Sequence, residues 1–208
     1  ISAHLCHPKC SCNDNASGVS ASMEVLRSLK HLMETGKLKK NRRTIKVILI
    51  PEFTGTYAYL SDHNEYKKVV GAINLDMVGG KQTRFYGPIT LTGLPYSTPS
   101  FINDLSSLCL DYAAEEVPNL GGKLVAKTNH TFESFSGGSD HTVFSDPTIG
   151  IPCCMVGQWP DLNYHTATDT LDVIDPEVLA FSCRTAALYA YTLANINEHN
   201  VKEIQNKA

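Results

Sequence analysis

The chain has 208 residues, of which 42% are hydrophobic and 19% are charged, a composition that fits one globular domain over residues 1–208 and excludes a disordered chain. The formal net charge is −3 and the one basic run, residues 37–43, is typical of a solvated turn, so nucleic acid is not an expected partner. The sequence contains no apolar stretch long enough for a membrane span, so no membrane partner is expected.

Taken in chain order, the apolar and β-branched residues predict strands that alternate with helices. Strands are expected at residues 1–5, 44–51, 69–77 and 149–156, with strand and turn at 83–94. Helices are expected at residues 17–34, 55–63, 99–114 and 175–195, and an irregular polar segment at 121–138. In the last helix, Asp175 is the expected cap and Pro176 the first helical residue.

This alternation predicts a three-layer α/β fold with a mixed, mainly parallel central sheet. In such sheets, ligands bind beyond the carboxyl ends of the strands. The reactive residues of a functional site should therefore follow the strands in the sequence.

The first residues of the chain and its cysteines lead to two further expectations, one about truncation and one about the cellular compartment. The first residues have the pattern of a buried strand, with neither an initiator Met nor a signal peptide before them, so we interpret the chain as a fragment truncated at its N-terminus. Seven cysteines, with Cys153 and Cys154 adjacent in an apolar run, are typical of reduced thiols and favour the cytoplasm. Cys6, Cys10 and Cys12 have irregular spacing and no second pair, so buried thiols are favoured over a structural zinc site.

Histidines and carboxylates do follow the predicted strands. They are His4, His7 and Asp14 after the first strand, Glu52 after the second, Asp76 at the end of the third, Asp140 and His141 before the fourth, and His165 and Asp169 after it. Imidazole and carboxylate ligands together suit zinc or a similar divalent ion. Singly, Asp14 also fits a helix cap and His165 a surface histidine, so the metal hypothesis depends on the ordered set.

The motifs DNASG, NLDMVG, SDH and YHT resemble those of the zinc aminopeptidases of peptidase family twenty-eight. The longer strings HLCHP, PEFTGTYAYLSDH, GGSDHTVFSDP and WPDLNYHTATDTLDVID resemble an aminopeptidase-like branch of that family with a Cys-His-Pro signature. The resemblance covers nearly the whole chain, least clearly residues 81–136. It implies a phosphorylase/hydrolase-like zinc peptidase architecture, a peptide substrate and one or two zinc ions, and it specifies no oligomeric state.

The resemblance also implies roles for individual residues. Asp14 corresponds to the aspartate that bridges two zinc ions, Asp76 to a ligand of one ion and His165 to a ligand of the other. Glu52 corresponds to the general base, which takes a proton from the water that the metal activates. The implied reaction is hydrolysis of the amide bond next to a free amino terminus.

Two positions depart from the family pattern. Phe53 stands where the family has a second glutamate, a zinc ligand, so the site could hold one zinc, or Glu52 could itself bind metal. The family's His-x-Asp motif is His4-Leu5-Cys6 here, which removes the aspartate that orients the histidine. We favour His7, in the Cys-His-Pro signature, as the ligand, with His4 as the alternative.

Three further residues are expected close to the metal. Asp140 and His141 match the SDH segment and should contact the ligands or the substrate, unless they only form a turn. Asp169 should either orient His165 or cap a loop. Two other functions remain open: a glutaminyl-cyclase-like enzyme with a single zinc, which shares the implied fold, and a binding module whose catalytic site has decayed.

Overall fold

The computed structural model of the chain describes residues 1–5, 7, 9, 11–62, 64–82, 87–115, 118, 120–121, 128–197 and 201–202. The strands are β1 (Ser2–His4), β2 (Ile48–Ile50), β3 (Ala72–Asp76), β4 (Ile89–Thr92), β5 (His130–Glu133) and β6 (Cys153–Gln158). The α-helices are α1 (Gly18–Glu34), α2 (Thr54–Asp62), α3 (Ile102–Glu115), α4 (His141–Phe144) and α5 (Pro176–Asn195). Shorter helical turns are η1 (Cys12–Ser17), η2 (Asn64–Lys68) and η3 (Leu171–Val173).

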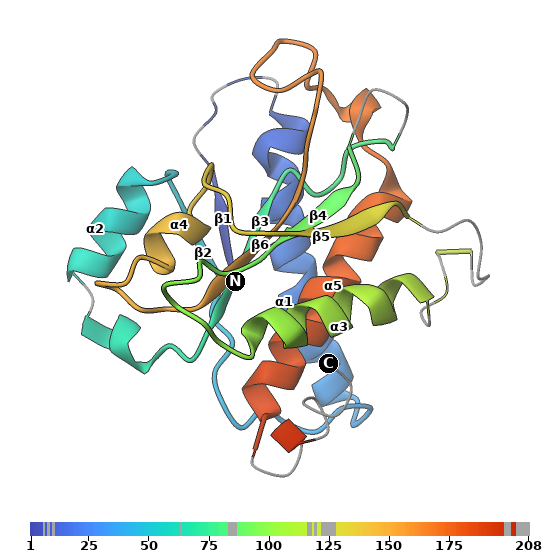
Figure 1. Ribbon diagram of the computed structural model, residues 1–208. Coiled ribbons are helices and arrows are strands. Elements are labelled where there is room, and N and C mark those ends of the chain that lie inside the picture. Colours follow the sequence, from blue (N-terminus) through green and yellow to red (C-terminus); the bar gives the residue numbers. More distant parts are fainter. Residues whose placement is uncertain are drawn as a thin grey trace.

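The strands form one six-stranded sheet in the order β2-β1-β3-β6-β4-β5 (Figure 1). β2, β1, β3 and β6 are parallel, whereas β4 is antiparallel to β6 and β5 follows the direction of β4. The predicted mixed, mainly parallel sheet is thus confirmed. The carboxyl ends of four strands meet at one edge, the position where such sheets bind ligands.

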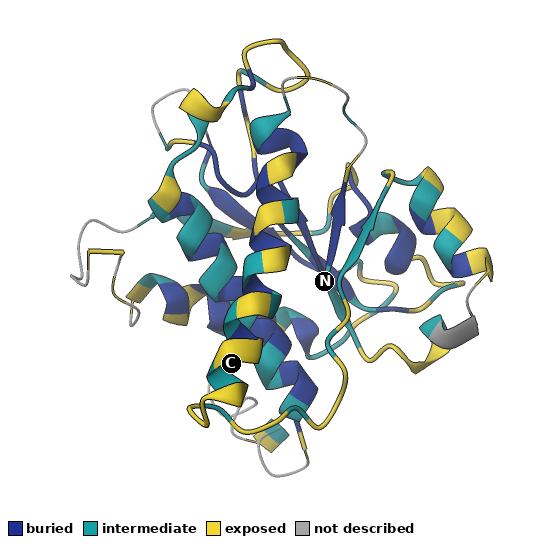
Figure 2. Cartoon of the chain, turned by 180° about the vertical axis from the view of Figure 1, so that it is seen from behind, coloured by how far each residue is buried: buried dark blue, intermediate teal, exposed yellow. Residues whose placement is uncertain are grey.

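Two apolar clusters hold helices against opposite faces of the sheet. The larger joins α1, α3 and α5 to β3, β4 and β6, with Leu75 and Val156 fully buried in it. The smaller joins α2 and α4 to the other face, where Cys153 lies in one cluster with Val143 and Phe144, whereas Cys154 belongs to the larger cluster. Figure 2 shows the buried residues gathered on the sheet and on the inner sides of these helices, with exposed residues on the outer sides. Successive strand residues therefore face opposite clusters, as the two-residue repeat of a strand requires.

The start of α5 follows the sequence closely, because Asp175 caps the helix by accepting a hydrogen bond from the backbone N–H of Glu177, and Pro176 is its first residue. The expectation of an irregular segment at residues 121–138 was wrong over His130–Glu133, which pairs with β4 as strand β5. Residues 83–86 and 122–127 lie outside the described part of the chain. Over that part, no helix combines the length and the apolar character needed to cross a membrane.

Candidate metal centre

The candidate residues gather at the carboxyl edge of the parallel strands. His4 is the last residue of β1 and Asp76 the last of β3, and these strands are neighbours in the sheet. His4 Nε2 lies 3.3 Å from Asp76 Oδ1. Glu52, two residues beyond β2, is close enough that one donor atom each of His4, Glu52 and Asp76 lie within 4.8 Å of one another. The strand-end rule applied to the sequence therefore places these three side chains together.

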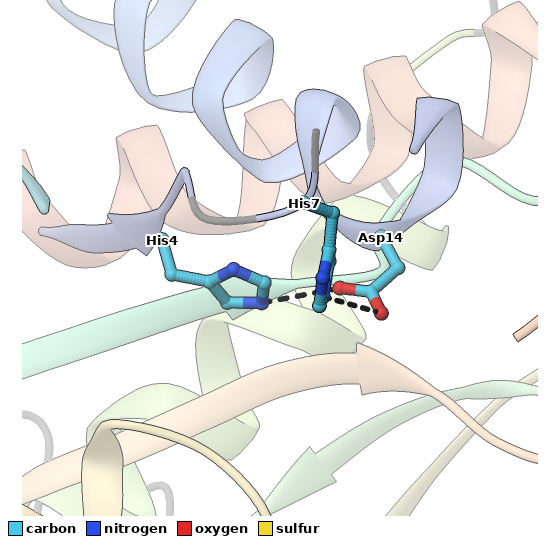
Figure 3. Close-up of side chains that lie close together, drawn as sticks. All are labelled: His4, His7 and Asp14. Atoms are coloured by element: carbon cyan, nitrogen blue, oxygen red, sulfur yellow. Dashed lines mark ion pairs between the residues drawn. The ribbon is translucent and has the colours of Figure 1, made fainter. Parts of the chain in front are cut away.

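Three histidines lie close to the Asp14 carboxylate. Its Oδ1 atom is 3.1 Å from His4 Nε2, whereas its Oδ2 atom is 3.1 Å from His7 Nε2 and 3.0 Å from His165 Nε2. Figure 3 shows His4 and His7 directed toward the Asp14 carboxylate, from β1 and from the loop after it. Both histidines that the sequence offered as alternatives thus contact Asp14, through different oxygens.

Two atoms of this group are buried without a hydrogen bond. Asp14 Oδ2 and His7 Nε2 are inaccessible to solvent, and their close approach lacks the orientation of a hydrogen bond. Leaving a buried polar atom unsatisfied costs about 1–3 kcal/mol, so such atoms in native proteins usually have a partner. A divalent ion would satisfy both, and the mixed imidazole and carboxylate donors are those that zinc accepts. The residues present therefore fit the zinc that the sequence motifs imply.

Burial and charge shift the pKa values of two residues in the centre. Burial acts to lower the pKa of His4, but hydrogen bonds to Asp14 and Asp76 and the nearby carboxylate charges outweigh it and raise the pKa to about 11. Burial raises the pKa of Glu52 to about 7; the charge of His4 opposes this rise, and the charges of Asp76, Asp140 and Asp14 add to it. A carboxyl group that titrates near neutrality is suited to general base catalysis.

Asp14 is held by a segment that bonds to the end of β3. Asn15 Nδ2 donates to the carbonyl of Leu75, and Asn15 Oδ1 accepts from the backbone N–H of Met77. Gly18 follows this turn, and a Cβ atom there would collide with the Leu75 carbonyl and the Asn15 side chain. The DNASG motif therefore combines a charged residue with residues that let it lie against the neighbouring strand.

Asn13 and Asn15 are positioning residues that the sequence interpretation missed. Asn13 is fully buried, accepts from the backbone N–H of Gly79 and donates to Asp161 Oδ2 at 2.8 Å. An amide on each side of a carboxylate at a helix start is the signal that could have identified them, because amides form local hydrogen bonds that stabilise tight turns.

Asp169 contacts the Asp14 segment and makes no bond to His165. Its two carboxylate oxygens accept hydrogen bonds from the backbone N–H groups of Asn13, at 2.7 Å, and Asp14, at 2.9 Å. Of the two roles considered from the sequence, the observed bonds correspond to capping of a loop. Burial raises the pKa of Asp169, and the two backbone donors oppose that rise.

Asp140 contacts the loop that carries Glu52. It accepts hydrogen bonds from the backbone N–H of Phe53 at 2.7 Å and from Thr56 Oγ1 at 2.8 Å, and burial raises its pKa. His141 Nε2 donates to the carbonyl of Ser136 at 2.8 Å, and burial lowers the pKa of His141. Asp140 therefore orients the Glu52 loop, while His141 lies next to it in the α4 turn.

Three residues at the centre have backbone conformations that side chains rarely adopt. Phe53, Met77 and His165 have φ angles of 51°, 60° and 55°. The first two directly follow Glu52 and Asp76, and the third is itself a candidate ligand. Such conformations cost on the order of 1–3 kcal/mol and cluster at functional sites, where the surrounding contacts hold them.

Aromatic side chains border the open side of the centre. The ring of Tyr164 stacks on that of His165, with centroids 3.7 Å apart, and Trp159 meets Tyr164 edge-on at 5.1 Å. Trp159 is 59% exposed. An exposed indole against the tyrosine that stacks on a candidate ligand offers an apolar surface to a bound molecule.

Two observations limit the alternative sites. Cys6 and Cys10 of the possible thiolate cluster lie outside the described residues, and Cys12 forms no disulfide with a described cysteine. A cavity of about 550 Å³ lies at the opposite edge of the sheet, bordered by Lys46, Tyr59 and Val69. It has no carboxylate or imidazole among its described lining residues, so it offers no metal ligands.

Comparison with known proteins places these features in a family. The family model described as peptidase family M28 matches residues 1–190. A Clostridium acetobutylicum protein, named for polysaccharide biosynthesis and an aminopeptidase-like domain, is 23% identical over 201 residues, which are 94% of this chain and 40% of that protein. The chain thus spans about two fifths of the length of this curated relative.

Solved structures share the fold. A zinc aminopeptidase from Bacillus subtilis superposes with a TM-score of 0.66 at 20% identity, over 95% of this chain and 46% of that one. A glutaminyl cyclase from Porphyromonas gingivalis superposes with a TM-score of 0.59 at 21% identity, over 90% of this chain and 70% of that one. At these identities the likeness establishes the α/β architecture alone.

Proposed function

Because the chain belongs to peptidase family M28, we propose that it carries the metal-binding catalytic site of a zinc-dependent aminopeptidase-like hydrolase. The reaction is cleavage of the amide bond next to a free amino terminus. The observation that carries the proposal is the position of the buried Asp14 carboxylate, whose two oxygens lie within 3.1 Å of three histidine nitrogens.

The ligands proposed for zinc are His4, Asp14, Asp76 and His165. A zinc ion bound there supplies a Lewis acid that polarises the scissile carbonyl and lowers the pKa of water toward neutrality. Asp169 and Asn15 keep the Asp14 carboxylate in place through its backbone and through the end of β3. Such supporting contacts orient metal ligands and affect metal affinity.

Glu52 is the proposed general base. Its carboxylate accepts the proton of the attacking water and can return it to the departing amine. Its raised pKa, about 7, makes both transfers accessible near neutral pH. Asp140 supports this role by holding the backbone of Phe53, the residue after Glu52.

A free amino terminus suits the charge around the centre. The carboxylates of Asp76, Asp140 and Asp14 are near enough to Glu52 for their charges to raise its pKa. Such a concentration of carboxylates attracts an ammonium group. We therefore propose that a peptide binds with its positively charged amino end toward the metal centre.

The test compares peptides that share a sequence and differ only at the amino end. The zinc-loaded protein should release the first residue of a free peptide and leave the N-acetylated peptide intact. Glu52→Gln should reduce kcat by about 10²-fold or more with zinc retained. Equal cleavage of both peptides would contradict the free-terminus requirement, and loss of zinc in the variant would make Glu52 a ligand.

Phe53 motivates a second candidate, a glutaminyl-cyclase-like enzyme with a single zinc, because it removes a carboxylate that the family pattern supplies. A peptide with N-terminal glutamine separates the two reactions: the cyclase closes the glutamine ring and releases ammonia, whereas the peptidase releases free glutamine. A protein that folds but binds no zinc would favour the remaining candidate function, a binding module whose catalytic site has decayed.

A further inference from the structure

Phe53 cannot contribute a metal ligand, because its side chain is a hydrocarbon. It contacts the apolar cluster formed by α2, α4 and the start of β6, which includes Val143 and Ile151. The centre therefore needs another donor if it is to hold a second ion.

His7 lies where such a donor is needed. Its Nε2 atom is 3.1 Å from Asp14 Oδ2. The Nε2 atom of His165 lies 3.0 Å from the same oxygen. The His7 and His165 rings have centroids 4.7 Å apart. His7 Nε2 is one of the buried atoms without a hydrogen bond, so a metal ion would satisfy it.

Asp76 is associated with His4 and Glu52. Its ion pair is with His4, which approaches Asp14 through Oδ1. The three histidines differ in the Asp14 oxygen that they approach, since His4 lies next to Oδ1 whereas His7 and His165 lie next to Oδ2. Asp76 and Glu52 group with His4, and donor atoms of His4, His7 and Asp14 also lie within 4.8 Å of one another. Two imidazoles and one carboxylate match the three protein ligands of a catalytic zinc with an open fourth position.

We propose that His7 is a zinc ligand and that, with His165 and Asp14 Oδ2, it forms a second metal position that compensates for Phe53. This inference rests on the proposed function. The other position consists of His4, Asp76 and Asp14 Oδ1, with Glu52 beside it. The ligand set therefore differs from that implied by the family motifs, in which a glutamate occupies the position of Phe53.

The two positions differ in access to solvent. The His7 and His165 side chains are 26% and 50% exposed, whereas those of His4 and Asp76 are 2% and 10% exposed. Water and chelators reach the His7 position more readily. We expect its zinc to leave first when the protein is dialysed against a weak chelator.

The experiment measures zinc per chain in the purified protein by elemental analysis, for the natural sequence, His7→Gln and His4→Gln. His31→Gln, a change of an exposed histidine on α1, is the matched control. We expect about two zinc ions per chain for the natural sequence and the control, and about one in each of the other variants. Circular dichroism establishes that each variant is folded.

Cobalt substitution gives a second readout that is independent of activity. The visible bands of bound Co²⁺ depend on its ligands, so His7→Gln should remove one set of bands and His4→Gln a different set. If His7→Gln retains both ions and its cobalt spectrum is unchanged, His7 is not a ligand and the inference is wrong.

The remaining outcomes separate this inference from the proposed function. One zinc in the natural sequence, lost in His4→Gln and retained in His7→Gln, would leave the hydrolase intact and overturn the second position. One zinc lost in both variants would mean a single ion shared by His4 and His7, and would also overturn it. A folded natural protein without zinc would overturn the proposed function itself.

Discussion

The Asp169 carboxylate accepts a hydrogen bond from the backbone N–H of Asp14 at 2.9 Å, although 155 positions separate the two residues in the chain. The same carboxylate binds the N–H of Asn13. Asp169 lies four residues beyond His165, so this contact joins the loop that carries one candidate ligand to the segment that carries another. Asp169 therefore helps to set the distance in space between His165 and Asp14.

Loss of this contact should weaken zinc binding. Asp169→Ala removes both acceptors of the Asn13 and Asp14 N–H groups, and we expect the Kd for zinc to rise about 10–100-fold. Asp169→Asn keeps one acceptor and should have a smaller effect. Asp172→Asn, at an exposed position three residues further on, is the control. Competition with a chromophoric chelator measures the Kd, and an unchanged Kd for Asp169→Ala would show that Asp14 is held by other contacts.

The pH dependence of hydrolysis should show the titration of Glu52. Its carboxylate is the active form, so kcat/KM should rise with pH as the proton leaves. Burial raises the pKa from 4.5 to about 7, and the positive charge of a bound zinc ion acts in the opposite direction. The acid limb of the kcat/KM profile should therefore fall between these two values. A Glu52→Gln enzyme with the same limb would exclude Glu52 as the base.

Trp159 should affect the affinity for the substrate more than the chemical step. It forms an exposed aromatic surface with Tyr164 beside His165. For peptides with an apolar first residue, we expect Trp159→Ala to raise KM several-fold, which corresponds to about 1 kcal/mol, and to leave kcat nearly unchanged. Tyr96→Ala is the control, because Tyr96 is 95% exposed and follows β4 at the opposite edge of the sheet. A fall in kcat with KM unchanged would contradict this role.

The parts of the fold that the sequence predicted are those in which local pattern and burial agree. The apolar run that contains Leu75 forms a strand buried on both faces, and Asp175 with Pro176 marks the start of α5. Strand β5 was missed because it is short and polar and lies at the edge of the sheet, where its last two residues are exposed. Its pairing with β4 is a tertiary contact that no local pattern records.

The site shows the same division. Because parallel strands end at one edge, the sequence could predict that His4, Glu52 and Asp76 would lie near one another. It could not assign His4 and His7 to different oxygens of Asp14, because that depends on the path of the loop between them. Nor could it show that Asp169 binds the Asp14 backbone, since the spacing around His165 is equally compatible with a bond to that histidine.

The most direct test of the metal centre is the zinc content of the purified protein beside that of Asp14→Asn. Asparagine has nearly the same shape as aspartate but carries no charge, and it replaces one of the two oxygens by a nitrogen that is not a zinc ligand. The account predicts bound zinc in the natural protein and its loss in a folded Asp14→Asn protein, together with loss of hydrolysis. Equal zinc content in the two proteins would show that Asp14 is not the residue around which the metal centre is built.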